Sequence, residues 1–212
     1  MSSLTLQEWF GSIDIYLFDQ LLKGRITPSM QVLDAGCGDG RNLVYFLRSG
    51  YNIYGIDQSA AAIAQARSLA TALAPQLPAE NFRVETVEAI SFTDLSFDVV
   101  VSSAVLHFAR DEDHWQSMVR EMWRVLKPGG ILFVRLASTV GVEKEIVQLA
   151  GRRYQLPDGS NRFLVDYQLL LATTAALNGE LIEPLKSVVV HNMRSMATWC
   201  LRKKFPTSAS LW

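Results

Sequence analysis

The sequence predicts an α/β protein with a mostly parallel sheet and helices on both faces. Three observations lead to this prediction. From residue 31 onward, short apolar runs alternate with amphipathic helical stretches, which is typical of strand–helix–strand units. Three of the apolar runs are hydrophobic almost throughout, as strands covered on both faces are. A glycine-rich turn separates the first run from the helix that follows it.

Five apolar runs are the predicted strands of this sheet. Each is followed by a turn and then, in most cases, by a helical stretch. Strands that are joined through such helical crossovers run parallel to each other. The predicted strands cover residues 31–35, 52–56, 82–86, 97–103 and 131–137.

Helices with a clear period lie before and between these strands. Ile13, Tyr16, Leu17 and Leu21 predict an amphipathic N-terminal helix that ends near Gly24. The same three- and four-residue spacing predicts further helices just after residue 40, over 63–73 and over 115–126. The Lys-Pro-Gly-Gly run at 127–130 ends the last of them.

The last third of the chain has a different pattern. Glycines and a Pro-Asp-Gly turn predict that residues 138–163 are an inserted segment, followed by a helix over 166–178. Two strands near 181–191 and 196–203 follow, and the tight connection around Asn192 makes them antiparallel. Pro184 places the first of them at a sheet edge. The expected organisation is an N-terminal helical cap (1–30), a main domain (31–204) with the insertion at 138–163, and a tail (205–212).

Composition excludes several classes of protein. The 212 residues carry 20 Lys+Arg and 21 Asp+Glu, and 49% are hydrophobic. Such a chain is neither disordered nor an electrostatic nucleic-acid binder. We find no apolar run long enough for a bilayer and no secretory signal at the start, so we expect a cytoplasmic globular protein. Cys37 and Cys200 have no His companions at metal spacing, and no metal site is predicted.

The strongest functional signal is residues 32–42, VLDAGCGDGRN. A strand ends at Asp34, three alternate glycines follow, and a helix begins. Glycines permit a sharp turn and a close approach of ligand to backbone, and the N–H groups of the new helix attract an anion. Asp57 follows at the end of the second strand, where a carboxylate can accept hydrogen bonds from both hydroxyls of a ribose. The pattern indicates an adenosine-containing ligand.

Two residues of this segment narrow the choice of ligand. A dinucleotide fingerprint requires glycine where Arg41 stands. Asp34, directly before the loop, gives a pyrophosphate no advantage but can help to hold an amino group. A ligand with adenosine at one end and an amino acid at the other fits both features. The loop and Arg41 would face its carboxylate, Asp34 its ammonium and Asp57 its ribose.

The segment resembles motif I and the following acidic motif of class I S-adenosylmethionine-dependent methyltransferases. Residues 96–108, SFDVVVSSAVLHF, resemble the family's fourth strand and following loop, and 124–130, RVLKPGG, resemble the turn into its fifth. The resemblance covers roughly residues 31–137. Residues 40–42 with Tyr45 and Gly50-Tyr51 are similar to the small-molecule methyltransferases of the tellurite-resistance type. The implied Rossmann-like methyltransferase fold has a seven-stranded, mostly parallel sheet whose last strand is antiparallel.

The resemblance implies that the cofactor is S-adenosyl-L-methionine. Where the family often has an Asp-Ala pair that meets adenine, this chain has Thr86-Val87 followed by Glu88. The backbone N–H of Val87 can still serve the ring, and Glu88 can substitute for the acid. We expect Cys37 to be a small buried filler of the loop. The predicted cofactor-binding residues are Asp34, Gly36, Cys37, Gly38, Arg41, Asn42, Asp57, Gln58, Thr86, Val87, Glu88, Ser102 and Ser103.

The predicted acceptor pocket combines the N-terminal helix, the loop at 103–107 and the insertion. His107 is the candidate catalytic acid or base, and Tyr16 and Tyr154 are the candidate substrate-binding residues. We interpret the arginines of the insertion as a solvated surface, because acidic residues nearly balance their charge. We assign no role to His114, expected on a helix surface, or to His191, expected on an edge strand.

The sequence thus predicts an enzyme that moves a methyl group by in-line displacement to a small-molecule acceptor. Proximity and orientation supply most of the rate enhancement in such a reaction. Neither a nucleic-acid nor a membrane partner is expected, and neither the acceptor nor the oligomeric state follows from the sequence. The alternatives are a non-catalytic S-adenosylmethionine-binding sensor module and a nicotinamide-dependent oxidoreductase. Arg41 and Asp34 count against the oxidoreductase.

Overall fold

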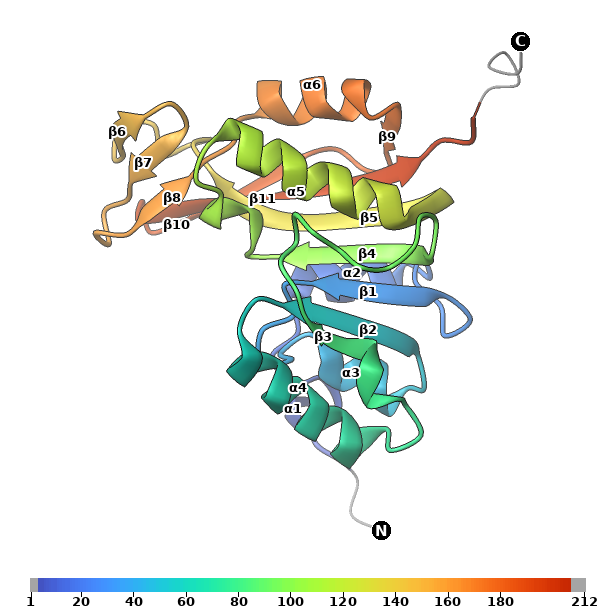
Figure 1. Ribbon diagram of the computed structural model, residues 1–212. Coiled ribbons are helices and arrows are strands. Elements are labelled where there is room, and N and C mark those ends of the chain that lie inside the picture. The colour runs from blue at the N-terminus through green and yellow to red at the C-terminus, as the bar shows by residue number, and fades with distance from the viewer. Residues whose placement is uncertain (1–3, 207–212) are drawn as a thin grey trace.

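The computed structural model describes residues 4–206 of the chain. Its centre is one mixed sheet with the strand order β10-β11-β5-β4-β1-β2-β3, and a further strand, β9, pairs with β11 (Figure 1). From position 207 on, the predicted tail 205–212 lies outside the described residues. Among the described residues, no helix is long and apolar enough to cross a membrane.

The strands confirm the predicted mixed sheet. β1, β2, β3, β4 and β5 pair in parallel with one another, whereas β11 is antiparallel to β5, β9 and β10. The strands of this sheet are β1 (Gln31–Ala35), β2 (Asn52–Asp57), β3 (Phe82–Val84), β4 (Phe97–Ser103), β5 (Leu126–Ser138), β9 (Gly179–Leu181), β10 (Lys186–Val190) and β11 (Arg194–Lys203).

Two details of the C-terminal hairpin differ from the prediction. The strand expected over 181–191 is two short strands, β9 and β10, and Pro184 lies in the break between them. A proline has no N–H for a ladder, so the chain leaves the sheet there. His191 is not on the edge strand but in the turn after it, where it and Asn192 have φ angles of 51° and 55°. Left-handed residues of this kind are typical of tight hairpin turns.

Helices cover both faces of the sheet because neighbouring residues of each strand point in opposite directions. In β5, Leu132 and Val134 enter the core under α5 and α6, whereas Ile131 and Phe133 enter the core under α2, α3 and α4. The helices are α1 (Leu6–Phe10), α2 (Ile15–Leu22), α3 (Leu43–Arg48), α4 (Ala60–Leu73), α5 (Glu112–Val125) and α6 (Tyr167–Ala176). The sequence predicted all of these except α1.

The insertion forms a small antiparallel sheet that the sequence did not predict. Its strands are β6 (Val147–Ala150), β7 (Arg153–Gln155) and β8 (Asn161–Phe163). In Figure 1 this sheet lies on the side to which the arrows of β1 and β4 point. Leu156 and Leu164 pack with Ala137 at the end of β5, so the insertion is fixed beside the carboxyl edge of the main sheet.

Trp115 is the centre of the core on the α5 side. Its ring is fully buried and lies 6.0 Å from the ring of Phe163 and 6.2 Å from that of Trp199. We expect Trp115→Ala to lower the free energy of unfolding by about 3–5 kcal/mol, since the large cavity cannot close fully. Chemical denaturation followed by circular dichroism measures this loss.

The matched control for this change is Trp9→Ala. The Trp9 side chain is 40% exposed on the short helix α1, so the same truncation should cost less than about 1 kcal/mol. Equal losses for the two variants would contradict the assignment of Trp115 to the core centre.

Candidate functional site

The loop after β1 has a backbone that only glycine adopts easily. Gly36, Gly38 and Gly40 have φ angles of 87°, 56° and 95°, all in the left-handed region. A Cβ at Gly36 would lie 2.4 Å from Cγ2 of Val105. The N–H groups of Gly36 and Cys37 both donate to the carbonyl of Ile56, at 2.8 and 2.9 Å. The loop is therefore held firmly against the end of β2.

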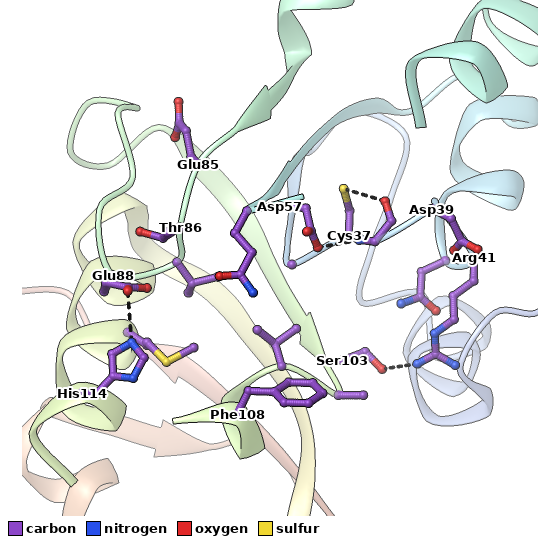
Figure 2. A pocket seen from close by; sticks show the side chains of 18 of the residues that line it. Cys37, Asp39, Arg41, Asp57, Glu85, Thr86, Glu88, Ser103, Phe108 and His114 are labelled. Carbon is purple, nitrogen blue, oxygen red and sulfur yellow. Dashed lines mark hydrogen bonds and ion pairs between the residues drawn. The ribbon is translucent and has the colours of Figure 1, made fainter. Parts of the chain in front are cut away.

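A cavity of about 440 Å³ opens at this loop, at the carboxyl ends of the parallel strands. In Figure 2, Glu88 and His114 lie on one side of it and Arg41 and Ser103 on the other. Of the thirteen residues predicted to bind the cofactor, eleven line this cavity: Gly36, Cys37, Gly38, Arg41, Asn42, Asp57, Gln58, Thr86, Val87, Glu88 and Ser103. Residues that are far apart in the sequence thus meet at one edge of the sheet.

The carboxylate of Asp57 is fixed by backbone groups. Its Oδ2 accepts a hydrogen bond from the N–H of Gly38 at 3.0 Å, and its Oδ1 accepts one from the N–H of Ser59 at 2.9 Å. Each oxygen keeps a further lone pair. The carboxylate can therefore accept two more hydrogen bonds, such as those of a vicinal diol.

His114 is a cavity residue that the sequence analysis missed. It was expected on a helix surface, but its side chain is only 10% exposed and lines the cavity. Its Nε2 lies 3.1 Å from Oε1 of Glu88, and its Nδ1 accepts a hydrogen bond from the N–H of Arg110 at 3.1 Å. The spacing to the buried Met118, one helical turn later, was the signal that could have found it.

Asp34 and Ser102 do not line the cavity, unlike the other eleven predicted cofactor-binding residues. Both are buried behind the loop, with 2% and 0% exposure. Among the described residues neither Asp34 oxygen has a hydrogen-bond partner, and the same holds for the Ser102 hydroxyl. Burial raises the pKa of Asp34 to about 7, although the nearby Arg41 guanidinium opposes the shift. A positive charge brought to the loop would stabilise the ionised form.

Cys37 has the role that was expected for it. The side chain is 3% exposed and packs in the core beneath the loop. Burial raises the pKa of its thiol far above the ordinary value, and the carboxyl groups of Asp34 and Asp57 act in the same direction. A thiol held protonated in this way is a poor nucleophile.

The N-terminal segment braces the wall between this cavity and a second one. Arg41 donates from Nη2 to the Ser103 hydroxyl at 2.8 Å, and this hydroxyl lies 3.4 Å from Oδ2 of Asp14. The N–H of Asp14 in turn donates to Oδ1 of Asn42 at 2.9 Å. Asp14 also caps α2, so one residue links the N-terminal helix to the loop and to β4.

The second cavity, of about 360 Å³, shares Arg41, Ser103 and Ala104 with the first. His107, the candidate catalytic residue, lines it and is 8% exposed. Burial lowers the pKa of this imidazole to about 4, and the nearby Arg162 adds to the shift. The His107 side chain is therefore neutral at pH 7.

The three segments predicted to form the acceptor pocket meet at this second cavity. The cavity is lined by Asp14, the N-cap of α2, by Ser103 at the end of β4 and His107 after it, and by Leu156 and other residues of the insertion. Two further strands that the prediction did not include, β5 and β11, complete the lining with Arg135, Ala137, Arg194 and Met196.

Tyr16 and Tyr154, the predicted substrate-binding residues, line neither cavity. The Arg135 guanidinium covers the ring of Tyr16, with Cζ 4.4 Å from the ring centre. Tyr154 packs against the small cluster of Ala137, Leu156 and Leu164. Both tyrosines thus lie one layer behind cavity residues, because their rings pack on neighbouring elements.

The first cavity fits an adenosyl amino acid in its donor set. The fixed Asp57 carboxylate has free lone pairs, the unpartnered Asp34 carboxyl group lies behind the loop, and the left-handed glycines allow a ligand to approach the backbone. Thr86 stands where the family often has an acid, and the Glu88 side chain lines the same cavity two residues later.

Comparison with known proteins agrees with this geometry. The model of the methyltransferase domain family matches residues 33–134. The chain is 32% identical over 151 residues to malonyl-[acyl-carrier protein] O-methyltransferase of Enterobacter lignolyticus, covering 71% of this chain and 55% of the relative. It is 34% identical over 122 residues to arsenite methyltransferase of Aquipseudomonas alcaligenes, covering 52% and 34%. The chain thus spans about half the length, or less, of these two relatives.

A solved structure supports the fold. An S-adenosylmethionine-dependent methyltransferase of Methanosarcina mazei superposes with a TM-score of 0.73 at 21% identity, over 88% of this chain and 98% of the other. The likeness at this identity concerns the fold alone. The family model, the curated relatives and the glycine loop with its acidic partner agree: residues 33–134 are a methyltransferase domain, and the chain is similar to the class I S-adenosylmethionine-dependent methyltransferases.

Proposed function

We propose that this chain transfers the methyl group of S-adenosylmethionine to a small-molecule acceptor. The observation that carries the proposal is the pair of adjoining cavities. One has the fixed Asp57 carboxylate and the glycine loop, the other has a neutral histidine, and they share a wall at Arg41, Ser103 and Ala104. S-adenosylmethionine supplies a methyl group on a sulfonium sulfur, which is already an activated leaving group.

The residues of the first cavity would bind and orient this cofactor. Asp57 would accept hydrogen bonds from the ribose hydroxyls, and the loop with Arg41 would face the carboxylate end. Val87 and Glu88 would meet the adenine ring, with His114 holding the Glu88 carboxylate at 3.1 Å. The backbone amides that fix Asp57 hold its carboxylate in place before the cofactor binds. The side chain therefore loses little conformational freedom on binding.

The second cavity would hold the acceptor, and His107 would serve its proton transfer. The cofactor would supply the methyl group to the acceptor atom, and the electron pair of the broken C–S bond would remain on sulfur. The His107 imidazole is neutral at pH 7 and so has a lone pair for the proton that the acceptor atom loses, but its lowered pKa makes it a weak base. Tyr16 and Tyr154 would act indirectly here, by positioning Arg135 and Leu156. The segments 1–30 and 138–163 would act as caps over the acceptor.

Replacing Asp57 tests the cofactor site. Asp57→Ala removes both carboxylate oxygens, and two lost hydrogen bonds to a charged group should weaken S-adenosylhomocysteine binding by at least about 100-fold. Asp57→Asn keeps one acceptor oxygen and should give an intermediate loss. Calorimetric titration measures both.

Asp113→Ala is the matched control, since Asp113 is exposed on α5, outside both cavities. Its affinity should equal that of the unaltered chain. Retention of full affinity by a folded Asp57→Ala variant would contradict the ribose assignment.

The pH dependence of cofactor binding tests the part played by Asp34. Below about pH 7 the free protein carries a protonated Asp34, and an ammonium near the loop must then displace that proton. The affinity for S-adenosylhomocysteine should therefore rise about tenfold from pH 6 to pH 8, since one proton is released on binding. The amide of Asp34→Asn has no proton to release in this pH range. The affinity of this variant for S-adenosylhomocysteine should therefore be the same at pH 6 and pH 8. A level profile for the unaltered chain would contradict this part of the proposal.

Turnover separates an enzyme from a sensor that only binds the cofactor. The chain is incubated with methyl-labelled S-adenosylmethionine and a cell extract that contains small molecules, proteins and nucleic acids. We expect label in the fraction that passes a filter which retains macromolecules, and none with the Asp57→Ala variant. Tight cofactor binding without any transfer of label would favour the sensor.

A further inference from the structure

The second cavity is rich in arginine although the chain as a whole is slightly acidic. Four arginines and two aspartates line it, which leaves an excess of two positive charges, and its only histidine is neutral at pH 7. The chain in total has a formal net charge of −1. The charged lining residues are Asp14, Arg41, Arg135, Asp158, Arg162 and Arg194.

Two of the four arginines are engaged within the protein. Arg41 donates to the Ser103 hydroxyl at 2.8 Å. Arg135 pairs with Asp14, Nε to Oδ2 at 3.3 Å, and donates from Nη1 to the Met196 carbonyl at 3.2 Å. These contacts connect the N-terminal segment to β4, β5 and β11. We therefore assign Arg41 and Arg135 a structural role in the cavity wall.

The other two arginines keep most of their donors free. Arg162 on β8 donates from Nη1 to the carbonyl of Asn161, and its guanidinium lies 4.9 Å from the ring centre of Phe108. Arg194, the first residue of β11, pairs with Val190 through its backbone, whereas its exposed guanidinium makes no hydrogen bond or ion pair with any residue between 4 and 206. A guanidinium carries five N–H donors in a planar fork that matches the oxygens of a carboxylate or phosphate.

Within the described part of the chain, the acidic residue on this side, Asp158, forms no direct ion pair with the two guanidinium groups, although its charge acts on both. It accepts a hydrogen bond from the N–H of Ser160 at 2.9 Å, and the contacts with Ser160 keep the pKa of this carboxyl below its ordinary value. After these contacts, the charges of Arg162 and Arg194 also lower its pKa. The insertion and the C-terminal hairpin therefore bring to one cavity two positive charges without a direct ion-pair partner between residues 4 and 206. The sequence analysis expected Arg162, an arginine of the insertion, on a solvated surface.

Besides its charged residues and the polar residues His107, Ser103 and Ser160, the cavity has an apolar part. Ala137, Leu156 and Met196 face the cavity from β5, the insertion and β11. Such a surface suits the hydrocarbon body of a small molecule, whereas the arginines suit its charged end.

We propose that the second cavity takes a methyl acceptor that bears an anionic group, a carboxylate or a phosphate monoester, and that Arg162 and Arg194 bind this group together. This inference rests on the proposed function and names the substrate class of the same site. The two arginines, on β8 and β11, line the second cavity but not the cofactor cavity. They would therefore determine which acceptor binds without taking part in cofactor binding. The charged end is thereby held away from the cofactor loop.

Matched pairs of small molecules test this inference on the full chain. In the presence of saturating S-adenosylhomocysteine, a series of small aromatic and aliphatic carboxylic acids is compared with their primary amides. A second arm compares phosphate monoesters with the parent alcohols. Thermal shift ranks the pairs, and calorimetry gives the affinity of the best binder. The acids or the phosphate esters, as a class, should bind at least about tenfold more tightly than the neutral partners.

Arg162→Gln and Arg194→Gln should each reduce the preference for the anionic compound over its neutral partner by about tenfold. Affinity for S-adenosylhomocysteine should change by no more than about twofold in Arg194→Gln, which lies outside the first cavity. Arg202→Gln is the matched control, because Arg202 is exposed at the other end of β11. It makes the same change in net charge and should leave the preference intact.

The outcomes separate the two proposals. If the unaltered chain does not bind S-adenosylhomocysteine, the proposed function fails. If it binds the cofactor product but takes acids and phosphate esters no better than their neutral partners, the anionic acceptor is overturned. A preference that survives both arginine substitutions also overturns it, since the charge would then be recognised elsewhere.

Discussion

The contact between the loop after β1 and the end of β2 is the constraint on which the site depends. Two N–H groups of the loop donate to the Ile56 carbonyl, and a third, from Gly38, donates to the Asp57 carboxylate. The left-handed backbone at three glycines makes this arrangement possible. Because Val105 packs where a Cβ of Gly36 would lie, the same loop also fixes the start of the segment after β4. Three strand ends are thereby held as one rigid unit.

The two cavities differ in charge as well as in position. Acidic side chains, including Asp57 and Glu88, line the first, and arginines predominate in the second. A donor with an ammonium and a sulfonium suits the acidic side, and an anionic acceptor suits the basic side. The shared wall carries one residue in an unusual conformation, Ala104, with a φ angle of 66°. Non-glycine residues with such angles cost conformational energy and occur preferentially at functional sites.

The elements with a regular pattern were predictable from the sequence. Strand β1 covers the predicted residues 31–35, and the stripe of apolar residues in α5 is buried as the spacing indicated. The cofactor loop and Asp57 were predictable because glycine and aspartate at those positions have few other uses. The small sheet of the insertion was not, since its strands are three or four residues long and their exposed residues carry no alternation.

The sequence by itself determined the fold class, the family resemblance and the position of the glycine loop relative to Asp57. These depend on local backbone conformation and on the hydrophobic period, and residues close in the sequence determine both. Only the tertiary structure decided which polar side chains face the cavities. It buried Asp34 and Ser102, brought His114 to Glu88, and placed Arg162 and Arg194, 32 positions apart in sequence, on the same cavity. Such meetings depend on how the helices and the insertion pack on the sheet edge, and no local pattern encodes that packing.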